Sequence, residues 1–184
     1  LNNDTGERIY NPLFKYSEFY RFYNALIHDE RLIRVMQEKG YRGKFFLHTH
    51  HKVQLKDFTG NDIIKVMQDG IDYQEEFRNN ALLVTDFSSV AFDFAYLKKP
   101  VIYAQFDKDT FFQGQVYSEG YFDYERDGLG PVCYDYESTI EALIHAIEND
   151  CVLDPLYDER GNAFYRWFDQ DNCKRVYDEI RRLH

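Results

Sequence analysis

The sequence predicts an α/β fold in which a Rossmann-like parallel sheet carries helices on both faces. Short apolar runs typical of strands alternate with helix-like segments along the chain. Each run is too uniformly apolar for a sheet with one face in water, which favours parallel strands covered on both sides. The 184 residues, 44% of them hydrophobic with 16 Tyr and 16 Phe, are enough to build one core. We therefore expect a single domain over residues 1–184, of which residues 154–184 form C-terminal helices.

The first predicted element is helical. Apolar residues recur at helical spacing behind Ser17 and again behind Asp29, and both residue types commonly cap the start of a helix. Gly40 then provides a typical helix end. These signals predict helix from about residue 18 to residue 39, with a kink near His28.

Strand-like and helix-like segments then follow one another. The predicted strands are KFFLHTH (44–50), DIIKVM (62–67), ALLVTD (81–86), PVIYAQF (100–106) and PVCYD (131–135). The predicted helices are YQEEFRNN (73–80), SSVAFDFAYLKK (88–99) and YESTIEALIHAIEN (136–149). Residues 105–131 are rich in aromatic and acidic side chains, which favours a long ordered loop with a function. Beyond Asp154 we expect two helices, the last with Val176, Ile180 and Leu183 on one face.

The composition argues against several functional classes. A net charge of −10 disfavours a general surface for nucleic acid or anionic membranes. No stretch approaches the 18 consecutive apolar residues of a membrane span, and no secretory leader opens the chain. Cys133, Cys151 and Cys173 have neither zinc-site nor disulfide-framework spacing, so we expect a reducing compartment. The chain opens on Leu1 rather than Met, which suggests a fragment of a longer protein.

The segment NNALLVTDFSSVAFDFAYLKKPVIY (79–103) places polar side chains between an apolar strand and an apolar helix. Asp86, Ser88 and Ser89 would lie at the carboxyl end of that strand, where open parallel sheets bind ligands. Either serine can cap the helix, and free amides of the first helical turn together with two hydroxyls would suit a diphosphate. The alternative is that the serines only cap a buried helix and that Asp86 only ends the strand.

Three His residues follow the first predicted strand in the segment LHTHHK (47–52). If the strand continues, His48 and His50 share one face and His51 points to the other. The neighbouring carboxylates are not at a recognisable metal-ligand spacing. An imidazole that donates to a phosphate oxygen is the preferred interpretation, because His can be cationic beside an anion. The alternative for His50 and His51 is no functional role.

Three motifs carry a resemblance to a known family. The segments LHTHHK, LLVTDFSSVAFDFAYLKKPVIY (82–103) and GYFDYERDGLGPVC (120–133) resemble the CDP-glycerol glycerophosphotransferases, the polymerases and primases of wall teichoic acid and related capsular polymers. The resemblance covers about residues 15–150. Members of this family resemble GT-B enzymes, in which two Rossmann-like domains face each other across a cleft. This chain resembles the second domain, which binds the nucleotide donor.

The resemblance also implies roles for individual residues. Ser88, Ser89 and His48, with Asp86 beside them, would hold the donor diphosphate. Thr49 stands where the family usually has Pro, which leaves open whether His48 or His50 takes that role. Further along the chain, the cleft would be bordered by Asp123, Glu125, Arg126 and Asp127. The alternative for these four is an acidic surface salt bridge. We expect no cofactor and no obligatory metal ion.

The implied activity is the transfer of glycerol phosphate from CDP-glycerol to a teichoic-acid-like or capsular acceptor, with release of CMP. A missing N-terminal domain would bind the lipid-linked polyol-phosphate acceptor and supply the general base, so this fragment would bind donor without turning it over. The parent enzyme would be cytoplasmic and peripheral at the inner membrane face, with no membrane span in this chain and no nucleic-acid partner. Two rivals remain: a glycosyltransferase that uses a UDP-sugar or CMP-sugar, and a non-catalytic interaction module.

Overall fold

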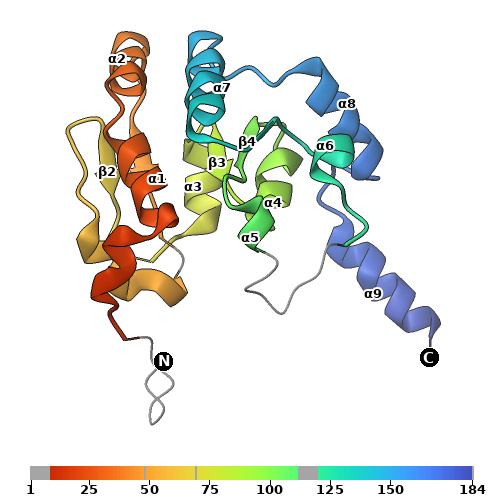
Figure 1. Ribbon diagram of the computed structural model, residues 1–184. Coiled ribbons are helices and arrows are strands. Elements are labelled where there is room, and N and C mark those ends of the chain that lie inside the picture. Colours follow the sequence, from red (N-terminus) through yellow and green to blue (C-terminus); the bar gives the residue numbers. More distant parts are fainter. Residues whose placement is uncertain (1–8, 48, 69, 112–119, 184) are drawn as a thin grey trace.

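The computed structural model describes residues 9–47, 49–68, 70–111 and 120–183, in which strands alternate with helices (Figure 1). The strands are β1 (Gly43–Phe45), β2 (Ile64–Val66), β3 (Leu83–Thr85), β4 (Val101–Ala104) and β5 (Val132–Cys133). The α-helices are α1 (Glu18–Ile27), α2 (Glu30–Lys39), α3 (Tyr73–Asn79), α4 (Val90–Tyr96), α5 (Lys108–Phe111), α6 (Tyr124–Asp127), α7 (Tyr136–Glu148), α8 (Pro155–Phe164) and α9 (Asn172–Arg182). Two 3₁₀ helices are η1 (Pro12–Tyr16) and η2 (Thr49–Asp57).

Every strand pair in the described residues is parallel, as predicted. β1 pairs with β2, with Gly43 opposite Ile64. β3, β4 and β5 form a three-stranded sheet in that order. The prediction of a parallel α/β fold is therefore confirmed, but the strands form two hydrogen-bonded sheets rather than one.

Two clusters of buried side chains lie on opposite faces of the three-stranded sheet. The first core consists of Ile27, Leu32, Val35, Met36, Phe58, Ile63, Ile64, Ile102, Cys133, Ile140, Leu143, Ile147 and Cys151. The second core consists of Ala91, Phe94, Ala95, Val101, Tyr103 and Leu129. Side chains of β4 alternate between them, since Ile102 belongs to the first core while Val101 and Tyr103 belong to the second. Helices α1, α2 and α7 therefore cover one face and α4 covers the other, which confirms the predicted layers.

The capping residues of the first helices are those that the sequence predicts. The Ser17 hydroxyl accepts a hydrogen bond from the Tyr20 amide at 3.1 Å and begins α1. The Asp29 carboxylate accepts from two amides and begins α2, so the chain forms two helices that meet near His28. Gly40 ends α2 in the left-handed region, with φ of 77°, which glycine adopts without steric cost.

The first predicted strand is shorter than expected. β1 ends at Phe45, and residues 49–57 form the 3₁₀ helix η2 rather than a continued strand. Pairing with β2 extends only from Gly43 to Phe45, so the following residues lack a ladder that would hold them extended. The common face of His48 and His50 was predicted only if the strand continues, and it does not continue at His50; His48 itself lies outside the described residues. The long loop over residues 105–131 contains α5 and α6, and its residues 112–119 lie outside the description.

The C-terminal part forms the two predicted helices. Figure 1 shows α9 extending away from the rest of the molecule. Val176 and Ile180 on this helix, and Leu183 directly after it, are more than half exposed, at 60%, 52% and 77%. Among the described residues, no helix combines the length and the apolar character needed to cross a membrane.

Candidate functional site

The polar turn Asp86–Ser89 lies directly between β3 and α4, as the sequence predicts. β3 ends at Thr85 and α4 begins at Val90, so the turn leaves the carboxyl end of the three-stranded sheet. Asp86 and Ser88 are half-buried, whereas Ser89 is exposed. This is the edge at which open parallel sheets bind their ligands.

The two serines differ in their hydrogen bonds. The Val90 amide donates to the Ser88 hydroxyl at a long 3.4 Å, and the Ala91 amide donates to the Ser88 carbonyl at 3.3 Å. Ser89 already has helical backbone angles and makes no capping bond through its side chain. The amides of Val90 and Ala91, which the sequence analysis expected to be free for a ligand, are thus hydrogen-bonded to Ser88. Of the two side chains, that of Ser89 is the better placed to meet a ligand, because it is exposed and does not cap the helix.

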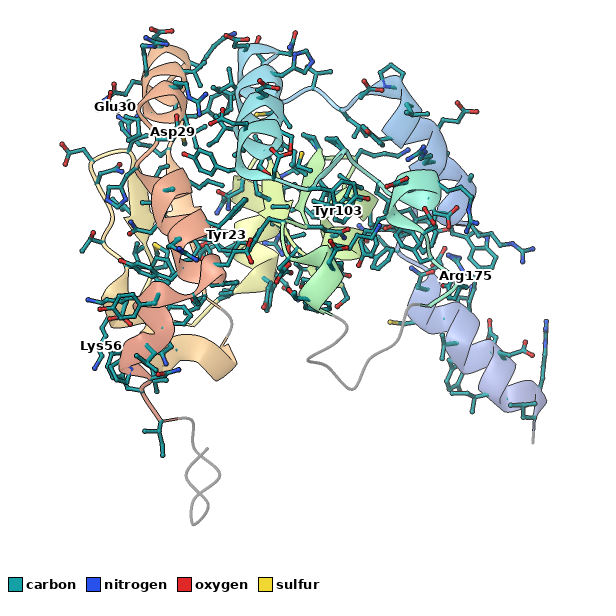
Figure 2. All side chains as sticks on the ribbon, in the orientation of Figure 1. Tyr23, Asp29, Glu30, Lys56, Tyr103 and Arg175 are labelled. Atoms are coloured by element: carbon teal, nitrogen blue, oxygen red, sulfur yellow. The ribbon has the colours of Figure 1, made fainter. Side chains whose placement is uncertain are left out.

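Aromatic side chains from α5 and α6 support this turn. The Phe87 ring stacks on Phe111 with a centroid distance of 4.0 Å and an interplanar angle of 19°. The Tyr124 hydroxyl donates to the Phe87 carbonyl at 3.3 Å, and the Tyr124 ring meets Tyr103 edge to face at 5.0 Å. Tyr103, which Figure 2 labels in the middle of the sheet, is completely buried. The turn is therefore attached to the second core through Tyr124.

Carboxylates make this edge of the sheet electrostatically negative. Burial raises the pKa of Asp107, which follows β4, and the nearby charges of Asp86 and Glu18 raise it further. Burial, and then the charges of Asp86 and Asp107, also raise the pKa of Tyr23 on α1. An anion bound here would need amide and hydroxyl donors or cations close enough to offset these charges.

Gln105 is a residue of this edge that the sequence interpretation missed. It follows β4 directly, and its backbone amide donates to the Cys133 carbonyl at 2.8 Å. Its side chain is 1% exposed, and within the described structure neither its amide nitrogen nor its amide oxygen has a hydrogen-bond partner. A buried unpaired amide is costly and commonly marks a place for water or a ligand group. A Gln after an apolar strand gives no sequence signal of its own.

The acidic loop residues bind mostly to one another. The Arg126 guanidinium contacts both carboxylate oxygens of Asp127, at 2.8 and 2.6 Å. Hydrogen bonds from Arg126 and from the Asp123 amide lower the pKa of Asp127 to about 2. The Asp123 carboxylate caps α6 by accepting from the Arg126 amide, and Glu125 accepts from the Tyr134 hydroxyl at 2.5 Å. A phosphate contact by Arg126 would therefore compete with an existing ion pair.

The histidines cannot be placed relative to the turn. His48 lies outside the described residues, and of His50 only the backbone is described, within η2. Among the side chains that the structure does describe, no three His, Cys, Asp or Glu come together as a metal site. The predicted roles of His48 and His50 stay predictions.

A shallow pocket of about 310 Å³, open to the surface, lies between α6, β5 and α8. It is lined by Tyr124, Glu125, Gly130, Pro131, Val132, Tyr134, Tyr157 and Arg160. Arg160 donates to the Gly128 carbonyl at 3.0 Å and so connects α8 to the loop after α6. Tyr124 belongs both to this lining and to the support of the turn. The sequence interpretation assigned no role to Tyr157 or Arg160, because only the tertiary fold brings them to the motif around Gly128.

The parallel strands, the two helical layers and the polar residues at the carboxyl ends of β3 and β4 define a Rossmann-like α/β domain. The chain belongs to the CDP-Glycerol:Poly(glycerophosphate) glycerophosphotransferase family, whose family model matches residues 1–182. The resemblance stated from the motifs is therefore confirmed. No solved structure is significantly similar to the chain.

Curated relatives of the chain have functions in teichoic acid synthesis. The chain is 39% identical over 178 residues to the minor teichoic acid biosynthesis protein GgaB of Bacillus subtilis (strain 168), a match that covers 97% of the chain and 19% of GgaB. It is 32% identical over 124 residues to a teichoic acid glycerol-phosphate transferase of Staphylococcus aureus (strain NCTC 8325 / PS 47), covering 66% of the chain and 30% of that protein. A teichoic acid poly(glycerol phosphate) polymerase of B. subtilis is 37% identical over 92 residues, 48% of the chain and 12% of the polymerase. The chain thus spans only a minor part of the length of these relatives.

Proposed function

We propose that this chain is the donor-binding domain of a glycerophosphotransferase that transfers glycerol phosphate from CDP-glycerol to a teichoic-acid-like acceptor. Family membership supports the reaction class. The observation that carries the assignment of the site is the position of Asp86–Ser89 at the carboxyl end of β3, where a parallel α/β sheet binds its ligand. The domain would be one half of a GT-B arrangement, in which residues 1–184 act as a single unit.

In the proposed site the donor diphosphate lies against the turn Asp86–Ser89. The exposed Ser89 hydroxyl donates to a phosphate oxygen, and His48 or His50 supplies a further donor. The unpaired side-chain amide of Gln105, which directly follows β4, is available at the same edge of the sheet, either directly or through a water molecule. Arg126 would bind the diphosphate only if its ion pair with Asp127 broke, so it contributes less to donor binding than the sequence motif suggests.

The chemistry is a displacement at the β-phosphorus of CDP-glycerol. The acceptor hydroxyl oxygen forms the new bond to this phosphorus, the bond to the bridging oxygen breaks, and CMP leaves. A base in another part of the full-length protein takes the hydroxyl proton. The residues of this chain align the diphosphate and offset its charge, which is where most of the acceleration of phosphoryl transfer arises.

The acceptor and the location of the enzyme follow from the same proposal. A lipid-linked polyol-phosphate chain would bind to the part of the protein outside these residues, at the inner face of the cell membrane. The capsular polymers named with the family are the other acceptor class. Under this proposal residues 1–184 alone bind the donor and do not turn it over.

Calorimetric titration of the full-length protein tests the proposed donor. CDP-glycerol should bind more tightly than any UDP-sugar or CMP-sugar, and Ser89→Ala should weaken its binding about tenfold or more because one charge-assisted hydrogen bond is lost. Thr59→Ala is the matched control, since Thr59 is an exposed hydroxyl residue outside the carboxyl edge of the sheet. Preference for a UDP-sugar would contradict the donor assignment. Absence of nucleotide binding would favour a non-catalytic interaction module.

A further inference from the structure

Gln105 has a buried side-chain amide whose nitrogen and oxygen both lack a hydrogen-bond partner within the described structure. The other described side chains with buried unpaired polar atoms have one such atom each: Gln54, Asp57, Tyr103 and Arg175. Leaving both ends of an amide unpaired away from water costs free energy, and natural proteins commonly retain such a group where water or a ligand pairs with it. The chemistry of this amide and its place in the fold therefore indicate what it binds.

The pairing of the strands determines the face on which the Gln105 side chain lies. The Gln105 backbone amide donates to the Cys133 carbonyl at 2.8 Å, so the ladder between β4 and β5 continues through this residue. Side chains alternate between the two faces along a strand, and Tyr103, two positions earlier, belongs to the second core. Gln105 therefore lies on the face of the sheet that α4 covers.

The register of the strands places Gln105 beside the turn Asp86–Ser89. Thr85 in β3 and Tyr103 in β4 are partners in this register. Two residues further along, the same register sets Gln105 level with Phe87 in the turn, about one strand spacing of 4.8 Å away. Figure 1 shows α5 close to this end of β4, and Gln105 belongs to the connection between them. The unpaired amide is therefore a neighbour of the turn at which the donor diphosphate is proposed to bind.

A phosphate group can pair with only one end of this amide. Ionised phosphate oxygens accept hydrogen bonds and donate none, so a diphosphate would satisfy the Gln105 nitrogen and leave its carbonyl oxygen unpaired. The surroundings also disfavour an additional anion, since burial and then the charge of Asp86 raise the pKa of Asp107, two residues after Gln105. A neutral group that both donates and accepts hydrogen bonds fits the amide better, and a hydroxyl does both.

Burial indicates which hydroxyls of the donor the amide would meet. CDP-glycerol carries hydroxyls on its ribose and on its glycerol. Ribose lies between the base and the diphosphate, so a subsite for it must be open on two sides, whereas glycerol is a terminal group and can enter an enclosed subsite. Gln105 is 1% exposed, which favours the terminal group. Cytosine is the other terminal group, but ribose separates it from the diphosphate, and Gln105 is level with the turn.

We propose that Gln105 recognises the polyol of the donor, an inference that rests on the proposed function. The Gln105 carbonyl oxygen accepts a hydrogen bond from a glycerol hydroxyl, and its NH₂ group donates to a hydroxyl oxygen, directly or through one water molecule. Gln105 takes part in no bond that is made or broken, so it is a specificity-determining residue. The unpaired amide lowers the stability of the ligand-free protein, a cost that is common where a site is built for recognition.

A donor analogue without hydroxyls tests this contact in the unchanged protein. The propyl ester of cytidine diphosphate has the carbon chain of glycerol but neither of its free hydroxyls, so it would leave the Gln105 amide unpaired. Sites that hydrogen-bond a substrate hydroxyl reject the analogue that lacks it strongly, for this reason. Calorimetry of the full-length protein should therefore show that CDP-glycerol binds at least about tenfold more tightly than the propyl ester. Equal affinity for the two would overturn the proposal.

Gln105→Met is the matched variant, because Met has a similar length and volume but lacks the amide donor and acceptor. It should bind CDP-glycerol and the propyl ester with affinities within about twofold of each other, while its affinity for CDP stays unchanged. Gln74→Met, on the exposed surface of α3, is the control and should keep the preference for CDP-glycerol. A tenfold preference retained by Gln105→Met would overturn the proposal. Equal weakening of CDP and CDP-glycerol would also overturn it, because the amide would then bind the diphosphate or the ribose.

Thermal unfolding without ligand distinguishes recognition from a purely structural role of Gln105. Replacing an unpaired buried amide by an apolar side chain of similar size removes its desolvation cost, so Gln105→Met should raise Tm by about 2–4 °C. A side chain that holds the fold together would lower Tm on substitution, and a lower Tm would overturn the proposal. Absence of CDP binding by the unchanged protein would refute the proposed function. CDP binding without a preference for CDP-glycerol over the propyl ester would refute only the polyol contact.

Discussion

Gly130 offers the sharpest test of the packing below the candidate site. A Cβ atom at this position would lie 2.7 Å from the Val101 carbonyl carbon and closer still to its oxygen. Real Cβ atoms do not approach backbone this closely, so Gly130→Ala must push the segment before β5 away from β4. Overpacking of this kind costs about 1–3 kcal/mol and sometimes more, and here the obstacle is rigid backbone. We therefore expect a loss of about 3 kcal/mol in the free energy of unfolding.

Thermal and urea unfolding of the full-length protein measure this loss. For a domain of this size about 3 kcal/mol corresponds to a fall of about 6–12 °C in Tm. Gly161→Ala is the matched control: a Cβ there meets nothing within 4 Å, and Gly161 lies inside α8. Replacing glycine by alanine within a helix should raise stability by about 0.5–1 kcal/mol. The two Gly→Ala variants should thus change Tm in opposite directions.

An unchanged Tm for Gly130→Ala would refute the close approach of Gly130 to β4. It would also weaken the placement of α6, because Gly128 is constrained in the same way, with a Cβ there 3.0 Å from the Tyr124 carbonyl carbon. Tyr124 supports the turn, so the position of the candidate site depends on these two glycines. This gives a steric reason for the glycines of the sequence DGLGP (127–131).

Three further predictions concern a lysine, a carboxylate and a tyrosine. Lys99 donates to three carbonyls at the end of α3, at 2.6–2.9 Å, so Lys99→Met should lower the free energy of urea unfolding by about 2 kcal/mol. Burial opposes ionisation of Asp29, but hydrogen bonds, the strongest of them from Arg31, lower its pKa to about 2. The stability that the Asp29 carboxylate contributes is therefore lost as the pH falls from 3.8 toward 2. Asp29→Asn should make Tm depend less on pH in that range. Tyr124→Phe removes the bond to the Phe87 carbonyl and should weaken CDP binding several-fold by calorimetry.

Each of these predictions has a clear contrary result. Lys174→Met, on the exposed surface of α9, is the control for Lys99→Met, and equal stability of the two variants would contradict the capping role of Lys99. If Tm of Asp29→Asn falls with decreasing pH as steeply as Tm of the unchanged protein, other carboxylates control the acid unfolding. Unaltered CDP binding by Tyr124→Phe would show that the turn does not depend on its aromatic support.

Local features of the fold were predictable because neighbouring residues determine them. Ser17 and Asp29 bind amides two or three positions ahead, and Gly40 adopts a backbone angle that favours glycine. The order of the strands and of the longer helices follows from hydrophobic spacing for the same reason, whereas η1, η2, α5 and α6 were not predicted. Strand length was not predictable, because it depends on a partner: the run 44–50 is paired only as far as Phe45.

Other features depend on contacts that the sequence pattern does not specify. The motif around Arg126 suggested a phosphate contact, but the Arg126 guanidinium forms an ion pair with the adjacent Asp127. The sequence alone could not decide between a phosphate contact and this ion pair. Arg160 reaches Gly128 only through tertiary packing. The division into two sheets depends on which strands pair with one another, and a pattern of apolar residues does not specify that pairing.

Calorimetry of the full-length protein with CDP and CMP tests the central claim most directly, because the two ligands differ only in the second phosphate. If the turn Asp86–Ser89 recognises the diphosphate, CDP should bind at least about tenfold more tightly than CMP, and Ser89→Ala should remove most of that difference. Equal affinity for CDP and CMP, unchanged by Ser89→Ala, would contradict a diphosphate site at the carboxyl end of β3.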